Sequence, residues 1–317
     1  MATSGSTNFE QSRNQVILDA FQLLGVYGIG RTVSAEDLSF AVSMLNKMIK
    51  AWGAKGLHLW AKEEGVVYVQ PDQASYLLGS TAKATLLSDE VVTQLNGAQA
   101  ASATSLTVDS TSGMTVADII GVVTTDKTIH WTTIATIPTS TTLTLTTGLD
   151  SAASDDALVY TYTTALNKPL RILSARRRTG LTTSQVDLPV VETAYESYFD
   201  LPNKNSASSP NQFHYSPKVA SGNLYLYPAP SDGSERICIT FERIIEDLDS
   251  TSDTFDFPPE WLEALTYQLA VRLGPPFGKD QRTMGSILPL ASSMLEDLLN
   301  WDAEISEVEM VPDLRDY

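Results

Sequence analysis

The stretch RNQVILDAFQLLG, residues 13–25, decides how the first part of this chain folds. Its apolar side chains recur at helical spacing and glycines follow at once, so we expect an amphipathic helix that ends in a glycine-rich turn. Thr7, with Glu10 three residues later, is typical of a capping box just before such a helix. The apolar face comprises Val16, Ile17, Ala20, Phe21, Leu23 and Leu24.

A second helix follows these glycines. It begins at Ser34, its first turn carries Glu36 and Asp37 near the positive end of the helix dipole, and Gly56 ends it. Two helices joined by a short glycine turn predict an antiparallel helical hairpin. The apolar stripe of this helix comprises Leu38, Ala41, Val42, Leu45, Met48, Ile49 and Trp52.

From Glu64 onward the apolar period changes from helical spacing to two. Residues 67–69 and 76–78 predict a pair of strands that turns at Pro71 and Asp72.

Residues 82–164 form a compositional island, dense in Thr, Ser, Ala and Val, with Lys83 and Lys127 as its only basic residues. Short β-prone runs recur in it at roughly even spacing, which predicts a small all-β sandwich or barrel. Thr-rich segments can also be disordered linkers, but the alternating apolar residues, Trp131 among them, favour an ordered domain. The runs are residues 106–108, 119–123, 129–133, 143–145 and 158–162.

The sequence between the island and the last helices of the chain predicts further strands. A short helix is expected near residues 192–200, and residues 201–217, rich in Pro, Asn and Ser, predict an extended loop. The expected strands are residues 170–178 and 186–191, together with a β-hairpin of residues 224–227 and 237–241.

Helices return towards the end of the sequence. Pro259 suits the first turn of a helix that runs through Trp261 and stops at Gly274. A final helix is expected from Leu288 to about residue 304, with Pro289 near its start or kinking it.

The predicted fold class is therefore α+β. A discontinuous core, residues 1–81 and 165–301, combines helices from both ends of the chain with strands. The sandwich- or barrel-like domain of residues 82–164 is inserted into it, and residues 302–317 form an extended acidic tail.

Charge and composition exclude several classes of protein. The chain has 21 basic and 38 acidic residues, a formal charge of −17, so it is poorly suited to grip DNA, although it could line a conduit through which DNA slides. The single cysteine, Cys238, excludes a disulfide framework and a cysteine-rich zinc site. No apolar run approaches the roughly 20 residues that span a bilayer, and the polar first residues are unlike a secretory signal. We therefore expect folding in a reducing cytoplasm.

No motif in the sequence predicts a catalytic residue, a cofactor or a metal site. His58, His130 and His214 lie far apart, without metal-ligand spacing, and Cys238 lies in an apolar strand pattern typical of a buried, inert thiol.

The acidic run of residues 246–256 resembles a calcium loop only in composition. Counted from Asp247, Ser252 stands where an EF-hand requires glycine and Pro258 where it requires glutamate. A solvated acidic loop is the favoured interpretation.

Three consecutive arginines stand out in this acidic chain. On a strand, Arg176 and Arg178 share one face and Arg177 lies on the other. They could contact DNA phosphates in a channel, or pair with carboxylates of a neighbouring subunit or of the same chain. The excess of acidic residues favours pairing.

Segments near both ends of the chain resemble the podovirus head-to-tail adaptors of the packaged-DNA-stabilisation (head completion) type. The island, with IHWTT at residues 129–133, resembles the β insertion of longer members. The segments that carry the resemblance are RNQVILDAFQLLG (13–25), TVSAED (32–37), LNKMIKAWGAKGL (45–57), LPNKN (201–205), GNLYLYPAP (222–230), FERIIEDLD (241–249), FPPEWLEAL (257–265) and YQLAVRL (267–273).

The resemblance implies a non-enzymatic virion protein at the head-tail junction, assembled in the host bacterial cytoplasm. Copies would form a ring on the portal protein, typically of twelve, which extends the DNA channel, helps retain the packaged genome until ejection, and offers the tail nozzle and fibres a platform. It also implies that the C-terminal tail reaches the portal. The tail residues expected to contact the portal are Asp302, Glu304, Ile305, Val308, Met310, Val311, Leu314 and Tyr317.

Two other functions remain open from the residues alone. One is a virion-borne glycosidase that degrades peptidoglycan, because the spatial separation of carboxylates cannot be read from a sequence. The other is a binding module, in which the β island recognises a host glycan or docks a tail fibre.

Overall fold

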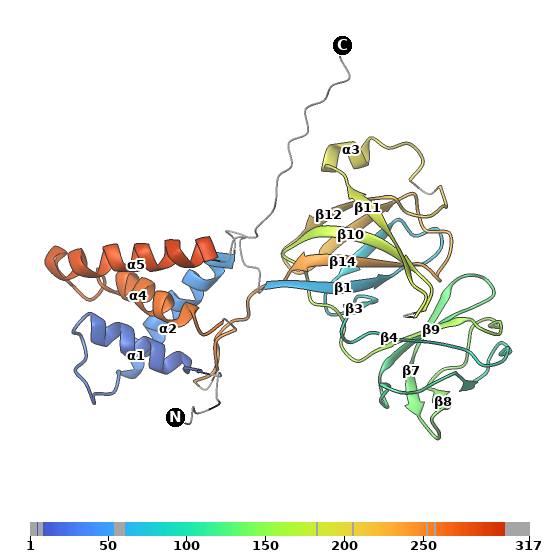
Figure 1. Ribbon diagram of the computed structural model, residues 1–317, viewed down its shortest axis with the longest axis horizontal. Coiled ribbons are helices and arrows are strands. Elements are labelled where there is room, and N and C mark those ends of the chain that lie inside the picture. Colours follow the sequence, from blue (N-terminus) through green and yellow to red (C-terminus); the bar gives the residue numbers. More distant parts are fainter. Residues whose placement is uncertain are drawn as a thin grey trace, which may run out of the picture. The chain divides into compact units, whose positions relative to one another are not determined.

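The computed structural model describes Gly5 and residues 9–53, 61–181, 183–204, 206–251, 253–256 and 258–301. It is an α+β protein, as predicted, and it divides into two compact units (Figure 1). The helical unit comprises Met1–Ala61 and Ile245–Tyr317, and the β unit comprises Lys62–Ile244. Whether residues 82–164 are a domain of their own stays a prediction.

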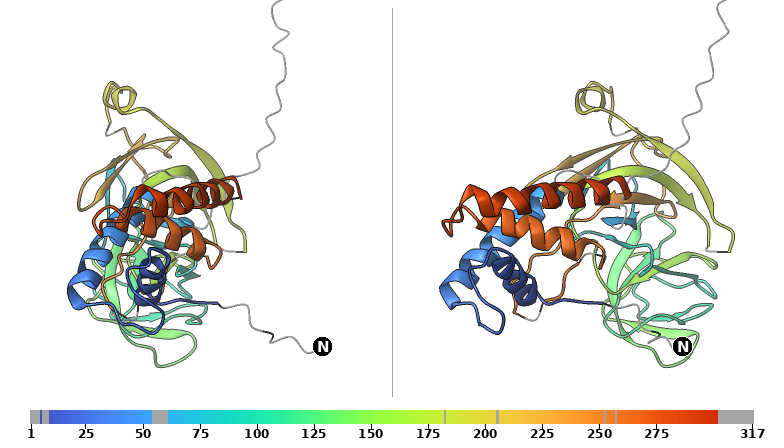
Figure 2. Two further views of the ribbon diagram at one scale, coloured as in Figure 1. Left: turned by 90° about the vertical axis from the view of Figure 1, so that its left-hand side faces the viewer. Right: turned by 60° about the vertical axis from the view of Figure 1, so that its left-hand side comes forward.

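Four helices from the two ends of the chain share one hydrophobic cluster in the helical unit. In both views of Figure 2, α4 and α5 run side by side, and α1 packs chiefly on α4. Trp52 and Trp261 meet in this core with ring centroids 5.8 Å apart. The helices are α1 (Arg13–Leu23), α2 (Ala35–Gly53), α4 (Trp261–Leu273) and α5 (Gln281–Trp301).

The helix starts follow local capping chemistry. Ser12 caps α1 by accepting the N–H of Gln15 at 3.4 Å, so α1 does not start at the predicted capping box of Thr7 and Glu10, of which Thr7 lies outside the described residues. Ser34 caps α2, as predicted, by accepting the N–H of Asp37 at 3.2 Å. In both caps, a side-chain oxygen accepts a hydrogen bond from a backbone N–H that the start of a helix leaves unpaired.

The last helix begins earlier than predicted. Asp280 accepts the N–H of Thr283 at 2.9 Å, and α5 starts at Gln281, not Leu288, so Pro289 lies inside the helix. The same N–H holds the pKa of the Asp280 carboxyl below its usual range. Residues 302–304 of the predicted helix lie outside the described residues.

The larger sheet of the β unit has eight strands in the order β2-β13-β12-β11-β10-β14-β1-β3. The helix α3 (Tyr195–Phe199) follows β11. The strands are β1 (Lys62–Tyr68), β2 (Ser75–Leu78), β3 (Ala84–Leu86), β10 (Arg171–Thr179), β11 (Val186–Glu192), β12 (Gln212–Pro217), β13 (Gly222–Tyr227) and β14 (Arg236–Glu242).

Two predicted strand pairs are wrong, although the strands themselves exist. β1 pairs with β14 and β3, and β2 pairs with β13, so they do not form a hairpin. β14 pairs with β1 and β10, not with β13. Both β1 and β14 bury side chains on both faces, which places them in the middle of the sheet, away from their sequence neighbours.

Part of the predicted loop at residues 201–217 is also wrong. Residues 212–217 form β12, in which Phe213 and Tyr215 alternate into the core. The sequence prediction missed β12 because its short alternation of apolar and polar residues follows a long polar stretch.

The second sheet has six strands in the order β4-β9-β6-β7-β8-β5. Its ends meet, because Asn96 donates its N–H to Thr107 O at 2.9 Å and Asp109 donates to Gln94 O at 3.0 Å. These bonds close the sheet into a small barrel around its own hydrophobic cluster. The strands are β4 (Val91–Gln94), β5 (Ser105–Thr107), β6 (Ile119–Val123), β7 (Ile129–Thr136), β8 (Thr142–Leu145) and β9 (Leu158–Tyr162).

The two faces of the larger sheet bury against different partners. Val67, Ile237 and Ile239 face one cluster, which the eight-stranded sheet encloses by curling. Val66 and Cys238, which pair with one another in the register, face a second cluster shared with strands of the barrel. Because successive side chains on a strand point to opposite faces, one face of β1 and β14 lines the interior of the curled sheet and the other face forms its junction with the barrel.

Candidate functional site

The junction between the barrel and the larger sheet is built from aromatic side chains. The ring of Tyr68 on β1 lies 5.0 Å from that of Tyr160 and 5.6 Å from that of Tyr162, both on β9. Trp131 on β7 meets Tyr68 edge-on at 5.1 Å. Burial raises the pKa of all three tyrosines, so they stay neutral at physiological pH.

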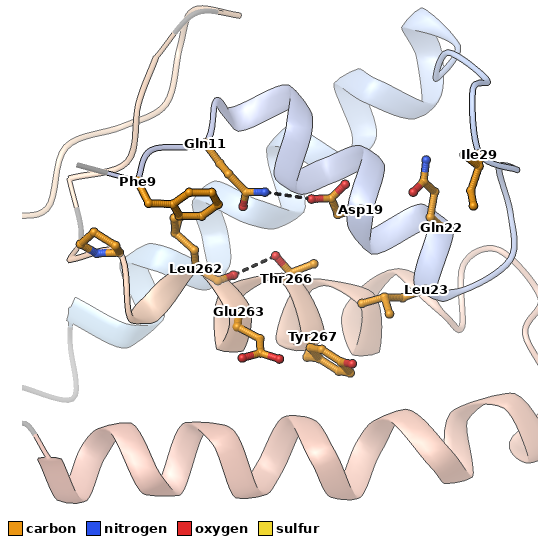
Figure 3. Close-up of a pocket in the computed structure, with 11 residues that line it drawn as sticks. Phe9, Gln11, Asp19, Gln22, Leu23, Ile29, Leu262, Glu263, Thr266 and Tyr267 are labelled. Carbon is orange, nitrogen blue, oxygen red and sulfur yellow. Dashed lines mark hydrogen bonds between the residues drawn. The ribbon is translucent and has the colours of Figure 1, made fainter. Parts of the chain in front are cut away.

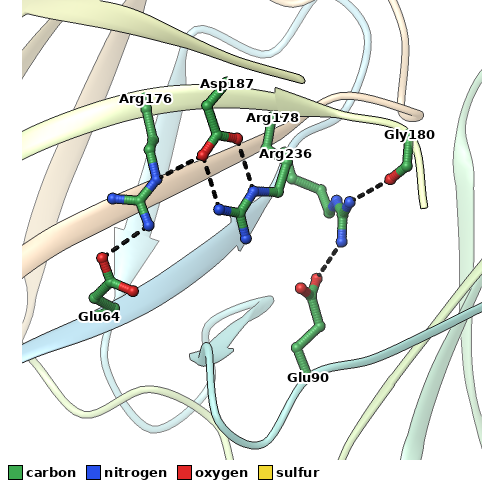
Figure 4. Close-up of polar contacts among 7 residues, drawn as sticks. All are labelled: Glu64, Glu90, Arg176, Arg178, Gly180, Asp187 and Arg236. Atoms are coloured by element: carbon green, nitrogen blue, oxygen red, sulfur yellow. Dashed lines mark hydrogen bonds and ion pairs between the residues drawn. The ribbon is translucent and has the colours of Figure 1, made fainter. Parts of the chain in front are cut away.

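A buried ion pair crosses this junction (Figure 4). Arg236 on β14 and Glu90, just before β4, are 2.9 Å apart, and their side chains are only 2% and 5% exposed. Arg236 also donates to Gly180 O at 2.6 Å and lies over the Tyr160 ring at 5.4 Å from its centroid. Such a pair stabilises the fold only while both charges are present, because either one alone would be a buried, uncompensated ion.

Side chains also fasten the junction to the backbone. The Gln70 amide donates to Ile129 O and accepts from the Ile129 N–H, each at 2.9 Å, as a neighbouring strand would. The Asp89 carboxylate accepts the N–H groups of Thr163 and Thr164 at 3.1 and 2.8 Å, which ties the chain entering the barrel to the chain leaving it. Hydrogen bonds as well as aromatic packing therefore join the barrel to the larger sheet.

The three consecutive arginines lie on β10 with the predicted alternation. Arg178 makes a two-pronged contact with Asp187, both bonds 2.8 Å, and Arg176 pairs with Asp187 at 3.0 Å and Glu64 at 2.8 Å (Figure 4). The hydrogen bond from Arg178 holds the pKa of Asp187 below its usual range.

The middle arginine points to the other face of the sheet. Arg177 lies 3.4 Å from Glu235, which also accepts from the Ser209 hydroxyl at 2.6 Å. The structure thus places all three arginines beside carboxylates of their own chain. A role in a DNA channel or between subunits stays a prediction.

Among the described residues, the titratable side chains singled out in the sequence, those of His130, His214 and Cys238, form no common site. His130 is buried and lies 2.8 Å from Asp150, whereas the His214 ring bonds to Thr193 O at 2.9 Å. Burial raises the pKa of the Cys238 thiol to about 11. Among the described residues no group of His, Cys, Asp and Glu side chains could hold a metal ion, and His58 lies outside them.

The acidic run is a loop fastened to the helices. Arg13 donates to Leu248 O at 3.1 Å, and the Asn46 amide bonds both backbone groups of Leu248, at 3.3 and 3.2 Å. Lys50 lies 2.8 Å from Asp247. These contacts organise the segment as a strap across α1 and α2, in which Glu246, Asp247 and Asp249 are exposed and the Asp253 carboxylate accepts the N–H groups of Asp249 and Ser250.

A groove of about 580 Å³ lies along α1 and α4 in the helical unit (Figure 3). Phe9, Leu23 and Ile29 line it with exposed apolar surface, and Asp19 and Glu263 add carboxylates. Sequence reasoning missed this groove, because the exposed residues Phe9 and Ile29 lie outside the helical pattern. The predicted portal-binding residues of the tail, 302–317, lie outside the described residues.

A family model described as SU10 adaptor protein matches residues 72–306. That match covers well over half of the chain, and the chain belongs to the SU10 adaptor protein family. It is thus a bacteriophage adaptor-type protein, a structural protein of the virion. None of the described helices is long and apolar enough to cross a membrane.

Other comparisons add little. No curated protein matches this chain. Among solved structures, VP17, a capsid protein of bacteriophage P23-77, is similar at 11% identity over 62% of this chain and 78% of VP17, with a TM-score of 0.12. A TM-score this low carries no argument about fold or function.

Proposed function

We propose that this chain is a head-to-tail adaptor of a tailed phage, whose copies form a ring below the portal protein. The ring extends the DNA channel, helps retain the packaged genome and provides a platform for the tail nozzle and fibres. The observation that carries this proposal is the adaptor family match over residues 72–306, which spans most of the β unit together with α4 and α5.

The charge of the chain suits a conduit. With a formal charge of −17 it repels DNA on average, and the cations of β10 already lie beside carboxylates. Tight DNA binding needs cations that are free to displace counterions at phosphates. Duplex DNA therefore slides through such a ring without sequence-specific binding.

The acidic tail is the proposed contact with the portal. Apolar and acidic side chains alternate irregularly in it, so a basic groove with apolar pockets on the portal would complement it. Truncation after Trp301 is expected to abolish stable docking on the portal. A truncated chain that docks with unchanged stability refutes the role of the tail.

The barrel is the proposed site for tail fibres or the nozzle. Deleting it is a poor test, because Tyr160 and Tyr162 cover Val66 and Tyr68 at the junction. Exposed threonines are better targets: Thr146→Arg with Thr147→Arg adds charge at two exposed positions just after β8, outside the cluster at the junction. Normal rings that lack fibres support docking, and normal fibre attachment refutes it.

The ring itself is tested by electron microscopy of the purified chain mixed with the portal protein of the same phage. We expect rings of the chain stacked on the portal. The portal can template assembly, so the mass of the free chain in solution decides nothing. A chain that stays monomeric in the presence of the portal refutes the proposal.

A further inference from the structure

The groove along α1 and α4 leaves large apolar side chains in contact with solvent (Figure 3). Ile29 is 95% exposed, Phe9 64% and Leu23 37%, and the buried Leu262 forms part of the floor. Several exposed apolar side chains lining one groove of a folded unit are typical of an interaction site. The volume, about 580 Å³, is enough for several side chains of a partner segment.

Two carboxylates, those of Asp19 and Glu263, also line this groove. Asp19 accepts hydrogen bonds from the side-chain amides of Gln11 and Gln15, at 3.2 and 2.8 Å. Within the part of the chain that the structure describes, neither Asp19 nor Glu263 forms an ion pair. A ligand that brings Lys or Arg beside its apolar residues complements both features.

Segments of this chain do not match that chemistry. Residues 1–8, MATSGSTN, contain Met1 as their only large apolar residue and neither Lys nor Arg. The tail of residues 302–317 is acidic and would be repelled by Asp19 and Glu263. Two copies that met groove to groove would bring Asp19 and Glu263 of each against the like charges of the other.

We propose that the groove binds an apolar segment flanked by Lys or Arg from a different virion protein. This inference rests on the proposed adaptor function, because it takes the partner from the proteins assembled around the ring. The segment lays its apolar side chains along α1 and α4, as an amphipathic helix does in a groove, and its cations meet the two carboxylates. The carboxylates orient the segment, and the apolar contacts supply most of the affinity.

Substitutions at the groove have matched controls in the same chain. Ile29→Asp changes a side chain that is 95% exposed, so folding is unaffected, yet it puts a charge on the apolar surface. Val219→Asp makes the same change on the β unit, where Val219 is fully exposed. We expect Ile29→Asp to lower incorporation of the partner at least tenfold and Val219→Asp to leave it unchanged. Glu263→Lys should lower incorporation of the partner, and Glu263→Asp should not.

The test uses phage particles in which the full chain carries a photoreactive benzophenone side chain at position 29 or, as a control, at position 219. Illumination and mass spectrometry of the cross-linked peptides identify the neighbour. We expect position 29 to cross-link to a Lys- or Arg-flanked apolar segment of another virion protein, and Glu263→Lys to reduce that yield.

Cross-links from position 29 that lead only to other copies of this chain, or to its own residues 1–8 or 302–317, overturn the inference. A cross-linking yield at position 29 that is no higher than the yield at position 219 also overturns the inference. In each of these cases the chain is present in the particle and the adaptor function stands. A chain that is absent from purified particles overturns the adaptor function instead.

Discussion

The buried pair between Glu90 and Arg236 gives the sharpest prediction about stability. Glu90→Gln keeps the size of the side chain but leaves the Arg236 charge, 2% exposed, without its carboxylate. Removing one partner of a buried pair costs about 3–5 kcal/mol. Arg236 keeps its hydrogen bond to Gly180 O and its contact with the Tyr160 ring, so we expect a loss near the lower end of that range.

Hydrogen exchange read by mass spectrometry is the appropriate assay, because the helical unit and the β unit need not unfold together. A loss of about 3 kcal/mol in the free energy of opening corresponds to roughly a hundredfold faster exchange. We expect this acceleration in peptides of β4, β9 and β14 and none in peptides of α1 and α4.

Two controls separate the pair from general damage. Asp247→Asn breaks an exposed pair with Lys50 and should cost about 0–1 kcal/mol. Glu90→Leu combined with Arg236→Met removes both charges and should regain at least half of the loss. If the hydrogen-exchange rate in peptides of β4 and β9 changes less than threefold in the Glu90→Gln variant, the stabilising role assigned to this pair is refuted.

Further substitutions test other parts of the account. The pKa of Asp187 is lowered in the folded state, so its carboxylate stabilises the fold above the unfolded value of about 3.9, and this stability is lost as the pH falls through the folded pKa. Asp187→Asn should therefore lower the free energy of unfolding at pH 7, with a difference from wild type that narrows below about pH 4 in urea titrations. Cys238, with a pKa raised to about 11, should resist thiol reagents at pH 8 until the protein is unfolded; labelling of the native chain at the rate of a free thiol would contradict its burial. In Gly121→Ala the new Cβ would lie 2.7 Å from the Trp131 ring, which should cost about 1–3 kcal/mol in thermal unfolding. Gly285→Ala meets no neighbour within 4 Å and should stabilise α5 by about 0.5–1 kcal/mol.

Local patterns predicted the elements, and distant contacts decided how they pair. The helices at residues 13–23 and 35–53 follow from apolar spacing and nearby caps, which are properties of a few adjacent residues. The partners of β1 and β14 depend on strands far along the chain, so adjacency in sequence predicted hairpins that do not exist. A strand that is apolar on both faces was the available signal that it lies in the middle of a sheet.

In the candidate site, too, local sequence patterns could not predict contacts between distant residues. Alternation on a strand correctly separated Arg177 from Arg176 and Arg178, but it could not identify their carboxylates. Glu90 and Arg236 are 146 positions apart, and neither stands in a pattern that marks it as buried. The groove is defined by Phe9 and Ile29 beside α4, a juxtaposition that only the packed helices create.

The position of this chain in the phage particle tests the central claim most directly. Cryo-electron microscopy of intact virions, with focused reconstruction of the head-tail junction, should show a ring directly below the portal into which the helical unit and the β unit each fit. Density for the chain only in the capsid shell or in the tail fibres, with no copy at the portal, would contradict the account.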